Sequence, residues 1–474
     1  MRTVNVILSV LLFSTCYCGD RSSFDRFFLD KTMRVDYYHT GTKGEEVFSL
    51  DEVYEEGPWP GSKTNVIDTL NLGEYLVRVY DVTTNLLIYS RGYSTIFNEW
   101  QTTGEAANGV YRTFSESVRF PYPKRNVQVT ISRRDKQMTF REHYRVVIDP
   151  GSPTAVNREA KPRPYRVVAL MENGPAEKKV DLLILGDGYT KAEMDKFRKD
   201  ARRLNEALFG ISPFKERKSA FNVWIIEVES VVSGIDKPDK NVWRTTPLGT
   251  SYNIFGSPRY LLTEENKTLR DVAAAAPYDF ITILVNDNRY GGGGIYNLYA
   301  TTYARTDAPG MEWQIEYVYV HELGHSFGGL GDEYYTSQVA YSEFYTAGVE
   351  PWEPNITALL NPKNVKWNRF IASDTPVPTP WEKAQYDSIA GLRYKLDRLA
   401  SDYYEKREPY IVAQARLLKT SEHSGTVGAF EGAGYAAKGL YRPAVDCRMF
   451  SLSLADFDPV CRTSIERMID FYAK

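Results

Sequence analysis

Histidine, cysteine and long apolar runs are scarce in this chain of 474 residues. It has five histidines and four cysteines, and after the first twenty residues one cysteine pair remains, Cys447 and Cys461. No later run approaches the length of a membrane span. The formal net charge is only −3 and no basic stripe or nucleic-acid motif is present, which argues against nucleic-acid binding.

The first residues are typical of a secretory signal peptide. Arg2 precedes an apolar run from Val6 to Phe13, and small polar residues follow. This run is too short to cross a bilayer as a mature helix but has the length of a signal-peptide core. We therefore expect residues 1–19 to be a signal peptide and the protein to be exported, whether secreted, periplasmic or on the cell surface. The context of Cys16 loosely resembles a bacterial lipoprotein processing site, so the membrane attachment considered is a lipid anchor there.

The length of the chain predicts two domains, because one hydrophobic core seldom serves so many residues. Residues 20–150 contain short β-branched and aromatic runs separated by polar turns, such as Val127–Ile131 and Met138–Ile148. Short strands at this spacing predict an N-terminal β-sandwich. Residues 151–165, rich in proline, serine and charge, predict a linker.

Residues 166–474 predict a catalytic domain of the α/β class. Val180–Leu185 is a buried-strand run, and a capping box at Thr190 and Glu193 opens a helix that runs to about Phe209. Further strands are expected at Phe221–Val228 and Phe280–Val285. Strands alternating with helices indicate an α/β domain, so the expected fold class of the whole chain is α+β multidomain.

Two loop features have a functional and a structural interpretation. Asp187 follows a strand, and we favour a turn residue that accepts backbone hydrogen bonds over a catalytic acid. The glycine run Gly291–Gly294 lacks the lysine and serine or threonine of a phosphate loop. It predicts a flexible turn or an edge strand that another backbone approaches closely.

The segment Tyr317–Tyr334 carries the pattern His-Glu-x-x-His. On a helix, His321 and His325 lie on one face, so both imidazoles can bind one metal ion. Glu322 lies one step round the same side, where it can act as the general base on a metal-bound water. Because peptide hydrolysis needs this division of roles, the pattern predicts a zinc peptidase.

A catalytic zinc ion takes three protein ligands and keeps one position open, so a third ligand is required. Gly328, Gly329 and Gly331 end the helix and let the chain turn back. Two carboxylates follow directly, of which Asp332 is the first choice and Glu333 the second. The alternative interpretation is that both are solvated residues of an acidic turn.

The segment from His321 resembles the metzincin consensus, although the metzincin ligand falls one residue earlier, where this chain has Gly331. The sequence more closely resembles the bacterial family of IgA-type metallopeptidases, which combine an N-terminal β domain with a zinc catalytic domain related to metzincins. The matching segments are Gly186–Thr190, His321–Tyr334, Glu431–Tyr435, Tyr441–Pro443 and Cys447–Met449.

This resemblance implies a metzincin-like α/β domain and an exported zinc-dependent endopeptidase that acts on proteins or peptides. It implies that His321, His325 and Asp332 hold one catalytic Zn2+, that Glu322 is the catalytic base and that Met449 packs beneath the metal. Two other functions remain open: a catalytically inactive surface or ligand-binding protein on a peptidase-like fold, and a zinc hydrolase of non-peptide amides.

The resemblance also implies that Gly291–Tyr303 is a sheet edge along which substrate lies as an added strand. An oxyanion donor is needed as well, and Tyr441, Tyr435 and His423 are candidates. The sequence does not specify a structural Ca2+ ion, the oligomeric state or the cleavage preference. Export would permit a disulfide in the C-terminal cysteine pair, but sequence spacing does not show whether the side chains meet.

Overall fold

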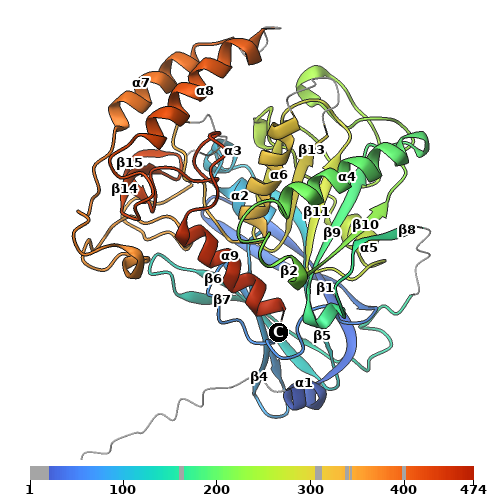
Figure 1. The fold of residues 1–474 in the computed structure, drawn as a ribbon. Helices are drawn as coiled ribbons and strands as arrows, with labels where there is room; N and C mark the ends of the chain where they lie inside the picture. The colour runs from blue at the N-terminus through green and yellow to red at the C-terminus, as the bar shows by residue number, and fades with distance from the viewer. Residues whose placement is uncertain are drawn as a thin grey trace, which may run out of the picture.

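The computed structural model of this protein describes residues 21–159, 165–304, 312–336, 341, 344–397 and 402–473 (Figure 1). The expected signal peptide lies outside these residues. Within them the chain is an α+β protein with several sheets and a β-rich N-terminal region. No helix in this described part of the chain combines the length and the apolar character needed to cross a bilayer.

Two antiparallel sheets build the N-terminal region, with strand orders β2-β1-β5 and β4-β3-β6-β7. Their strands are β1 Phe28–Thr42, β2 Glu45–Glu56, β3 Tyr75–Asp81, β4 Leu87–Tyr93, β5 Arg112–Pro123, β6 Val127–Arg134 and β7 Phe140–Ile148. Buried side chains of both sheets, such as Val35 and Val77, belong to one apolar core. The two sheets therefore share a core, and the runs that predicted β6 and β7 are strands.

Three short helices interrupt this region: α1 Arg21–Phe27, α2 Ile96–Gln101 and α3 Gly104–Ala107. The last two begin where a threonine side chain caps the helix. Thr95 accepts a hydrogen bond from the backbone of Asn98, and Thr103 does the same for Ala106. These helices were not expected, because a single capping residue is a weak signal in a β-rich sequence.

The first part of the expected linker packs against β2. The backbone N–H of Asn157 donates to the carbonyl of Val53 (2.8 Å), and its carbonyl accepts from Glu55 N (3.0 Å). Val156 is buried in the N-terminal core. Asn157 is thus held to β2 by strand-like pairing, while the domain limits expected from the sequence stay a prediction.

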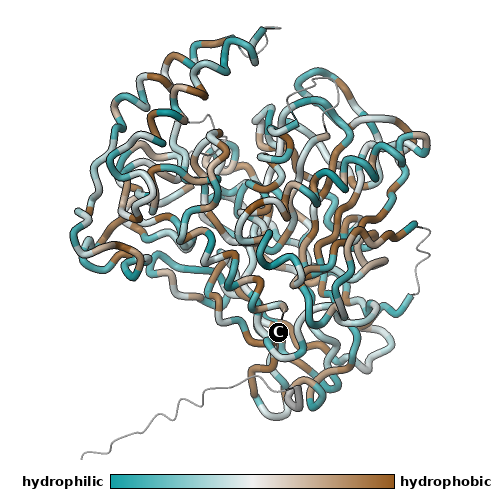
Figure 2. The backbone as a smooth tube through the Cα atoms, viewed as in Figure 1, coloured by the Kyte–Doolittle hydropathy of each residue, from teal (hydrophilic) through white to brown (hydrophobic). Residues whose placement is uncertain are grey.

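A six-stranded mixed sheet organises the rest of the chain, in the order β12-β13-β11-β9-β10-β8. Its four central strands are parallel, and β8 and β12 run antiparallel at the two edges. The strands are β8 Arg166–Met171, β9 Val180–Asp187, β10 Phe221–Glu227, β11 Phe280–Val285, β12 Gly292–Ile295 and β13 Tyr299–Tyr303. Much of the hydrophobic colour in Figure 2 lies along these strands, as burial on both faces requires.

Helices cover this sheet and extend beyond it: α4 Met194–Leu208, α5 Asn266–Ala273, α6 Glu312–Ser326, α7 Lys383–Tyr394, α8 Tyr403–Lys419 and α9 Pro459–Tyr472. The predicted capping box is present before α4, where Glu193 accepts from the backbone of Thr190 (2.9 Å). A hairpin of β14 Phe430–Ala433 and β15 Ala436–Arg442 lies beside α7 and α8 (Figure 1). Phe97 and Trp100 of α2 join the apolar core of the large sheet, so the N-terminal region is packed against it.

Candidate metal centre

The helix α6 lies along β12 and β13 and carries both predicted histidines. The Nε2 atoms of His321 and His325 face each other at 3.2 Å, as expected for residues one turn apart. The helix ends at Ser326, and Gly329 follows with φ +62, a conformation that glycine adopts without strain. This turn brings the next residues back toward the two imidazoles.

Asp332 is the carboxylate that this turn delivers. Its Oδ1 lies 3.0 Å from His321 Nε2 and 3.3 Å from His325 Nε2. The donor atoms of the three residues all lie within 4.8 Å of one another. The structure therefore brings together the three residues that the sequence predicted as metal ligands.

Hydrogen bonds on the far side of each ring set the direction of the lone pairs. His321 Nδ1 lies 3.1 Å from the carbonyl oxygen of Arg448, and His325 Nδ1 lies 2.6 Å from that of Leu330. A carbonyl oxygen only accepts, so each Nδ1 carries the proton and each Nε2 presents a lone pair. This arrangement is typical of metal-binding histidines.

The cluster fits a divalent cation because its acceptors have nothing else to satisfy them. Two Nε2 lone pairs face the carboxylate of Asp332, and the buried Oδ1 has no aligned hydrogen-bond donor among the described residues. The Tyr435 hydroxyl occupies only the other oxygen, Oδ2, at 2.5 Å. Burial alone would lower the pKa of His325, but the Asp332 carboxylate outweighs it and raises that pKa to about 10, so a proton and a metal ion compete for the Nε2 lone pair. The site thus attracts positive charge, and imidazole with carboxylate suits zinc.

Glu322 lies beside the cluster without belonging to it. Its carboxylate faces the cavity described below, and burial raises its pKa, while His321 and His325 act in the opposite direction. A Cβ added to Gly292 would lie 2.9 Å from Glu322 Oε1, and one added to Gly294 would meet the Glu322 carbonyl. The glycine run is thus an edge strand, β12, that α6 approaches closely.

Glu333, the second candidate ligand, points away from the histidines. Its Oε1 accepts from Asn355 Nδ2 (2.9 Å) and from Cys461 Sγ (3.2 Å). Its backbone N–H donates to Met449 O (2.9 Å). The geometry therefore separates the two neighbouring carboxylates, and only Asp332 lies in the histidine cluster.

Met449 is fully buried beneath α6. Its Sδ would lie 2.8 Å from a Cβ added to Gly324, the residue between the two histidines that makes this close approach available. The methionine therefore supports the helical turn that carries both imidazoles, which is the packing role implied by the resemblance.

The cluster opens into a cavity of about 1490 Å³. Its wall includes Gly292–Gly294 of β12, residues of α7 and α8, and residues of the N-terminal region such as Arg134. The main chain of Gly292 is already paired with Arg259 and Leu261, so this part of the β12 edge is not open to an added strand. Of the three oxyanion candidates, Tyr435 lines the cavity, whereas Tyr441 and His423 do not.

Two further residues of the cavity wall were missed from the sequence. The Tyr334 ring is stacked 6.2 Å from the His321 ring, and Arg259 Nη2 donates to the Tyr334 hydroxyl at 3.4 Å. This donation leaves the hydroxyl hydrogen of Tyr334 free for a substrate oxygen. Tyr334 directly follows the predicted ligands and was within reach of sequence reasoning, but Arg259 comes from a distant loop with no motif.

Asp187 has the structural role that we favoured. It is buried and accepts hydrogen bonds from Thr246 Oγ1 (2.9 Å) and from the backbone of Leu248 (3.2 Å) and Thr250 (3.1 Å). Its partners belong to a distant loop rather than to its own turn. It does not line the cavity.

Two protein-family models match this chain, one over its N-terminal region and one over the rest. A model of the family described as IgA Peptidase M64 matches residues 168–469, and a model described as Peptidase M64 N-terminus matches residues 23–145. No curated protein matches the chain. Since the first match covers more than half of the chain, the protein belongs to the IgA peptidase M64 family, a family of metallopeptidases, and is a peptidase.

Proposed function

We propose that this protein is an exported zinc-dependent endopeptidase whose zinc ion is held by His321, His325 and Asp332. The supporting observation is the set of three acceptor atoms within 4.8 Å of one another, open on one side to a large cavity. Three protein ligands with an open position are what a catalytic zinc site requires. A helix bearing two histidines above a buried methionine also supports a metzincin-like catalytic domain.

A zinc ion bound there would lower the pKa of a water molecule towards about 7 and polarise the carbonyl of the scissile bond. Glu322 accepts the proton of the attacking water and delivers it to the leaving amine, so that the C–N bond breaks after the C–O bond forms. Burial, which raises the pKa of Glu322, makes this carboxylate a better base for that transfer. Tyr334, polarised by Arg259, donates a hydrogen bond to the carbonyl oxygen as negative charge develops on it.

A protein or peptide substrate suits the dimensions of the cavity. Pockets for small ligands measure roughly 300 to 1,000 Å³, and this cavity exceeds that range. Its wall is also formed by the N-terminal region, β12 and the helices α7 and α8. A bound polypeptide substrate would therefore extend past the cluster on both sides. This breadth favours cleavage within a polypeptide over hydrolysis of a small amide.

The decisive experiment is an assay of peptide-bond cleavage by the purified chain on an unfolded protein, followed by mass spectrometry of the products. Cleavage should stop when a chelator removes the metal and return with added zinc. Glu322→Ala should lose activity by about three orders of magnitude while keeping its zinc, because the principal base is gone and the ligands remain.

Glu316→Ala is the matched control, because Glu316 lies on the same helix outside the cavity. It should retain activity near that of the unaltered protein. Cleavage that survives both the chelator and Glu322→Ala would reject the mechanism, and a chain that binds zinc but cleaves nothing would favour a ligand-binding protein on a peptidase-like fold.

Export is tested separately. Amino-terminal sequencing of the protein recovered from its own cells should find residues 1–19 removed. A mature chain that instead begins at a lipid-modified Cys16 would identify a lipoprotein, whereas an intact Arg2 in the mature protein would contradict export through a signal peptide.

A further inference from the structure

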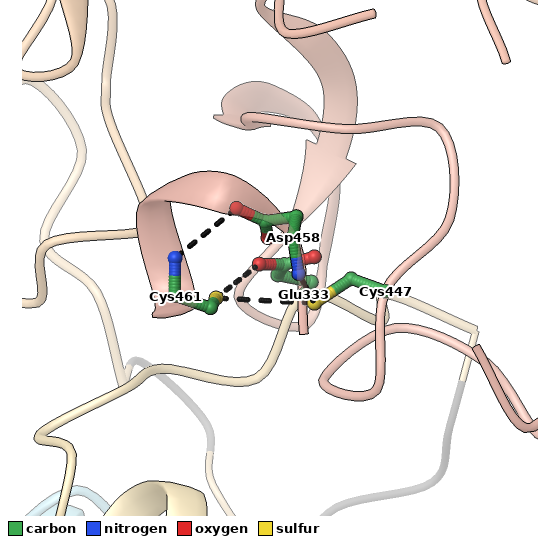
Figure 3. Close-up of side chains that lie close together, drawn as sticks. All are labelled: Glu333, Cys447, Asp458 and Cys461. Atoms are coloured by element: carbon green, nitrogen blue, oxygen red, sulfur yellow. Dashed lines mark hydrogen bonds between the residues drawn. The ribbon is translucent and has the colours of Figure 1, made fainter. Parts of the chain in front are cut away.

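A second group of metal-binding side chains lies behind the histidine cluster. Glu333, Cys447, Asp458 and Cys461 each place a donor atom within 4.8 Å of the others, and all four side chains are buried. They come from the loop after α6, the turn that carries Met449 and the start of α9. Figure 3 shows the four side chains close together, with Cys461 Sγ in contact with Glu333 and Cys447 and the Asp458 carboxylate in contact with the backbone nitrogen of Cys461.

The separation of the two sulfur atoms is that of two thiolates on a tetrahedral zinc ion. The two sulfur atoms lie 3.8 Å apart, and Cys461 Sγ lies 3.2 Å from Glu333 Oε1. Two thiolates on a tetrahedral zinc ion, with bonds of about 2.3 Å, are separated by about 3.8 Å. A disulfide requires about 2.05 Å, and both cysteines are free.

One oxygen of each carboxylate in the group lacks a hydrogen-bond donor. The other oxygens are occupied: Glu333 Oε1 accepts from Asn355 Nδ2, and Asp458 Oδ1 accepts from the backbone N–H groups of Val460 (2.7 Å) and Cys461 (3.1 Å) at the start of α9. Glu333 Oε2 and Asp458 Oδ2 are buried and accept no hydrogen bond from any described residue. The nearby Arg442 donates to main-chain carbonyl oxygens instead. The backbone N–H groups of Met449 and Asp458 point at Cys447 Sγ from 3.5 and 3.4 Å, as suits a negatively charged, metal-bound sulfur.

We propose that Glu333, Cys447, Asp458 and Cys461 bind a second zinc ion in a closed, structural site. Thiolate ligands select zinc over magnesium or calcium, which prefer sets composed of oxygen atoms. Four protein ligands complete a tetrahedron, and none of the four lines the cavity, so no position is left for substrate. The inference stands on these residues alone and does not depend on the proposed peptidase mechanism.

Such an ion would stabilise the histidine cluster from the side opposite the cavity. Glu333 directly follows Asp332, and its N–H donates to Met449 O (2.9 Å). Arg448, one residue earlier, supplies the carbonyl that orients His321. The second zinc ion would therefore tie the loop of the third ligand to the turn that sets the direction of the first.

The test measures metal in a chain whose catalytic cluster has been removed. The parent is the full chain carrying Cys16→Ser, Cys18→Ser, His321→Ala and His325→Ala, so that every thiol signal comes from Cys447 and Cys461. After purification with zinc, elemental analysis should find one zinc ion per chain. Replacement by cobalt should produce the near-ultraviolet thiolate-to-cobalt charge-transfer band, a signature that a merely structural pair of thiols does not have.

Cys447→Ser and Cys461→Ser should each weaken this band, because one of the two thiolates is lost, and should weaken zinc binding by about 100-fold or more. Asp446→Asn is the matched control: its carboxylate accepts from Ser451, Ser453 and the backbone of Cys447 and offers no atom to the group. Since asparagine keeps an acceptor oxygen, the band should remain. The band is first measured in the parent, which keeps all four residues of the group. The test therefore does not depend on whether a cysteine variant folds. Two freely alkylated thiols without metal, or a disulfide detected by mass, would overturn the proposal.

Discussion

Asp332 and Glu333 are neighbours in the sequence, yet their carboxylates belong to two different clusters. Asp332 joins two imidazoles on the side of the cavity, and Glu333 joins two thiols and a second carboxylate on the closed side. The first cluster offers three candidate ligands and lines the cavity, and the second offers four candidate ligands and does not line it. The comparison teaches that the number of protein ligands and the access to solvent, rather than burial, separate a catalytic metal site from a structural one.

The largest effect on activity should come from neutralising these two neighbouring carboxylates in separate variants. Asp332→Asn should lower kcat/KM by about three orders of magnitude, because the histidine cluster loses its only anionic ligand. Glu333→Gln should cost about tenfold or less in kcat/KM while lowering the melting temperature, since it acts only through the position of Asp332. Kinetics, zinc content and thermal unfolding of both variants measure this contrast, and equal losses of activity would erase the distinction between the clusters.

The proposed role of the Tyr334 hydroxyl, which lies on the cavity side of the histidine cluster, can be tested by removing it. Tyr334→Phe removes the hydroxyl that Arg259 polarises, and we expect kcat to fall about 100-fold with KM little changed, as for other oxyanion donors. Tyr441→Phe is the control, because Tyr441 lies outside the cavity wall. A rise in KM with unaltered kcat would instead assign Tyr334 to substrate binding.

The close packing of β12 on α6 provides a further test of the histidine cluster. In Gly294→Ala the new methyl group would meet the Glu322 carbonyl and lie 2.9 Å from His325 Cβ, so α6 must shift. A displacement of about 1 Å at catalytic groups costs roughly 100-fold in rate. In Gly293→Ala the atom nearest to the new methyl group is in the flexible side chain of Leu262, so this variant should lose less activity. Steady-state kinetics of the two variants would contradict this account if their order were reversed.

Local patterns in the sequence were sufficient for the histidine cluster and for the elements around it. The helical spacing of His321 and His325, the capping box before α4 and the apolar run of β11 each depend on a few adjacent residues, and all are present. The separation of Asp332 from Glu333 is different in kind. It depends on Met449 and Cys461, which are distant in the sequence and become neighbours only through packing. The same reason hides Arg259 and the thiol cluster from sequence analysis.

The smallest effect concerns a third buried acidic group, which a proton rather than a metal ion neutralises. His39, buried between the β1, β2 and β5 strands, contacts Glu116 Oε2 (3.0 Å) and Glu46 Oε2 (3.1 Å), and Glu46 also pairs with Arg133 and His143. Burial alone would lower the pKa of His39, but the two carboxylates outweigh it and raise that pKa.

A raised folded-state pKa stabilises the fold below the unfolded value, about 6.5, and this stabilisation is lost as the pH rises through the folded value. The difference in unfolding free energy between the unaltered chain and His39→Gln should therefore shrink as the pH rises above neutrality. A difference that grows with pH would mean that His39 is neutral in the fold, and that its two acidic neighbours are balanced by Arg133 instead.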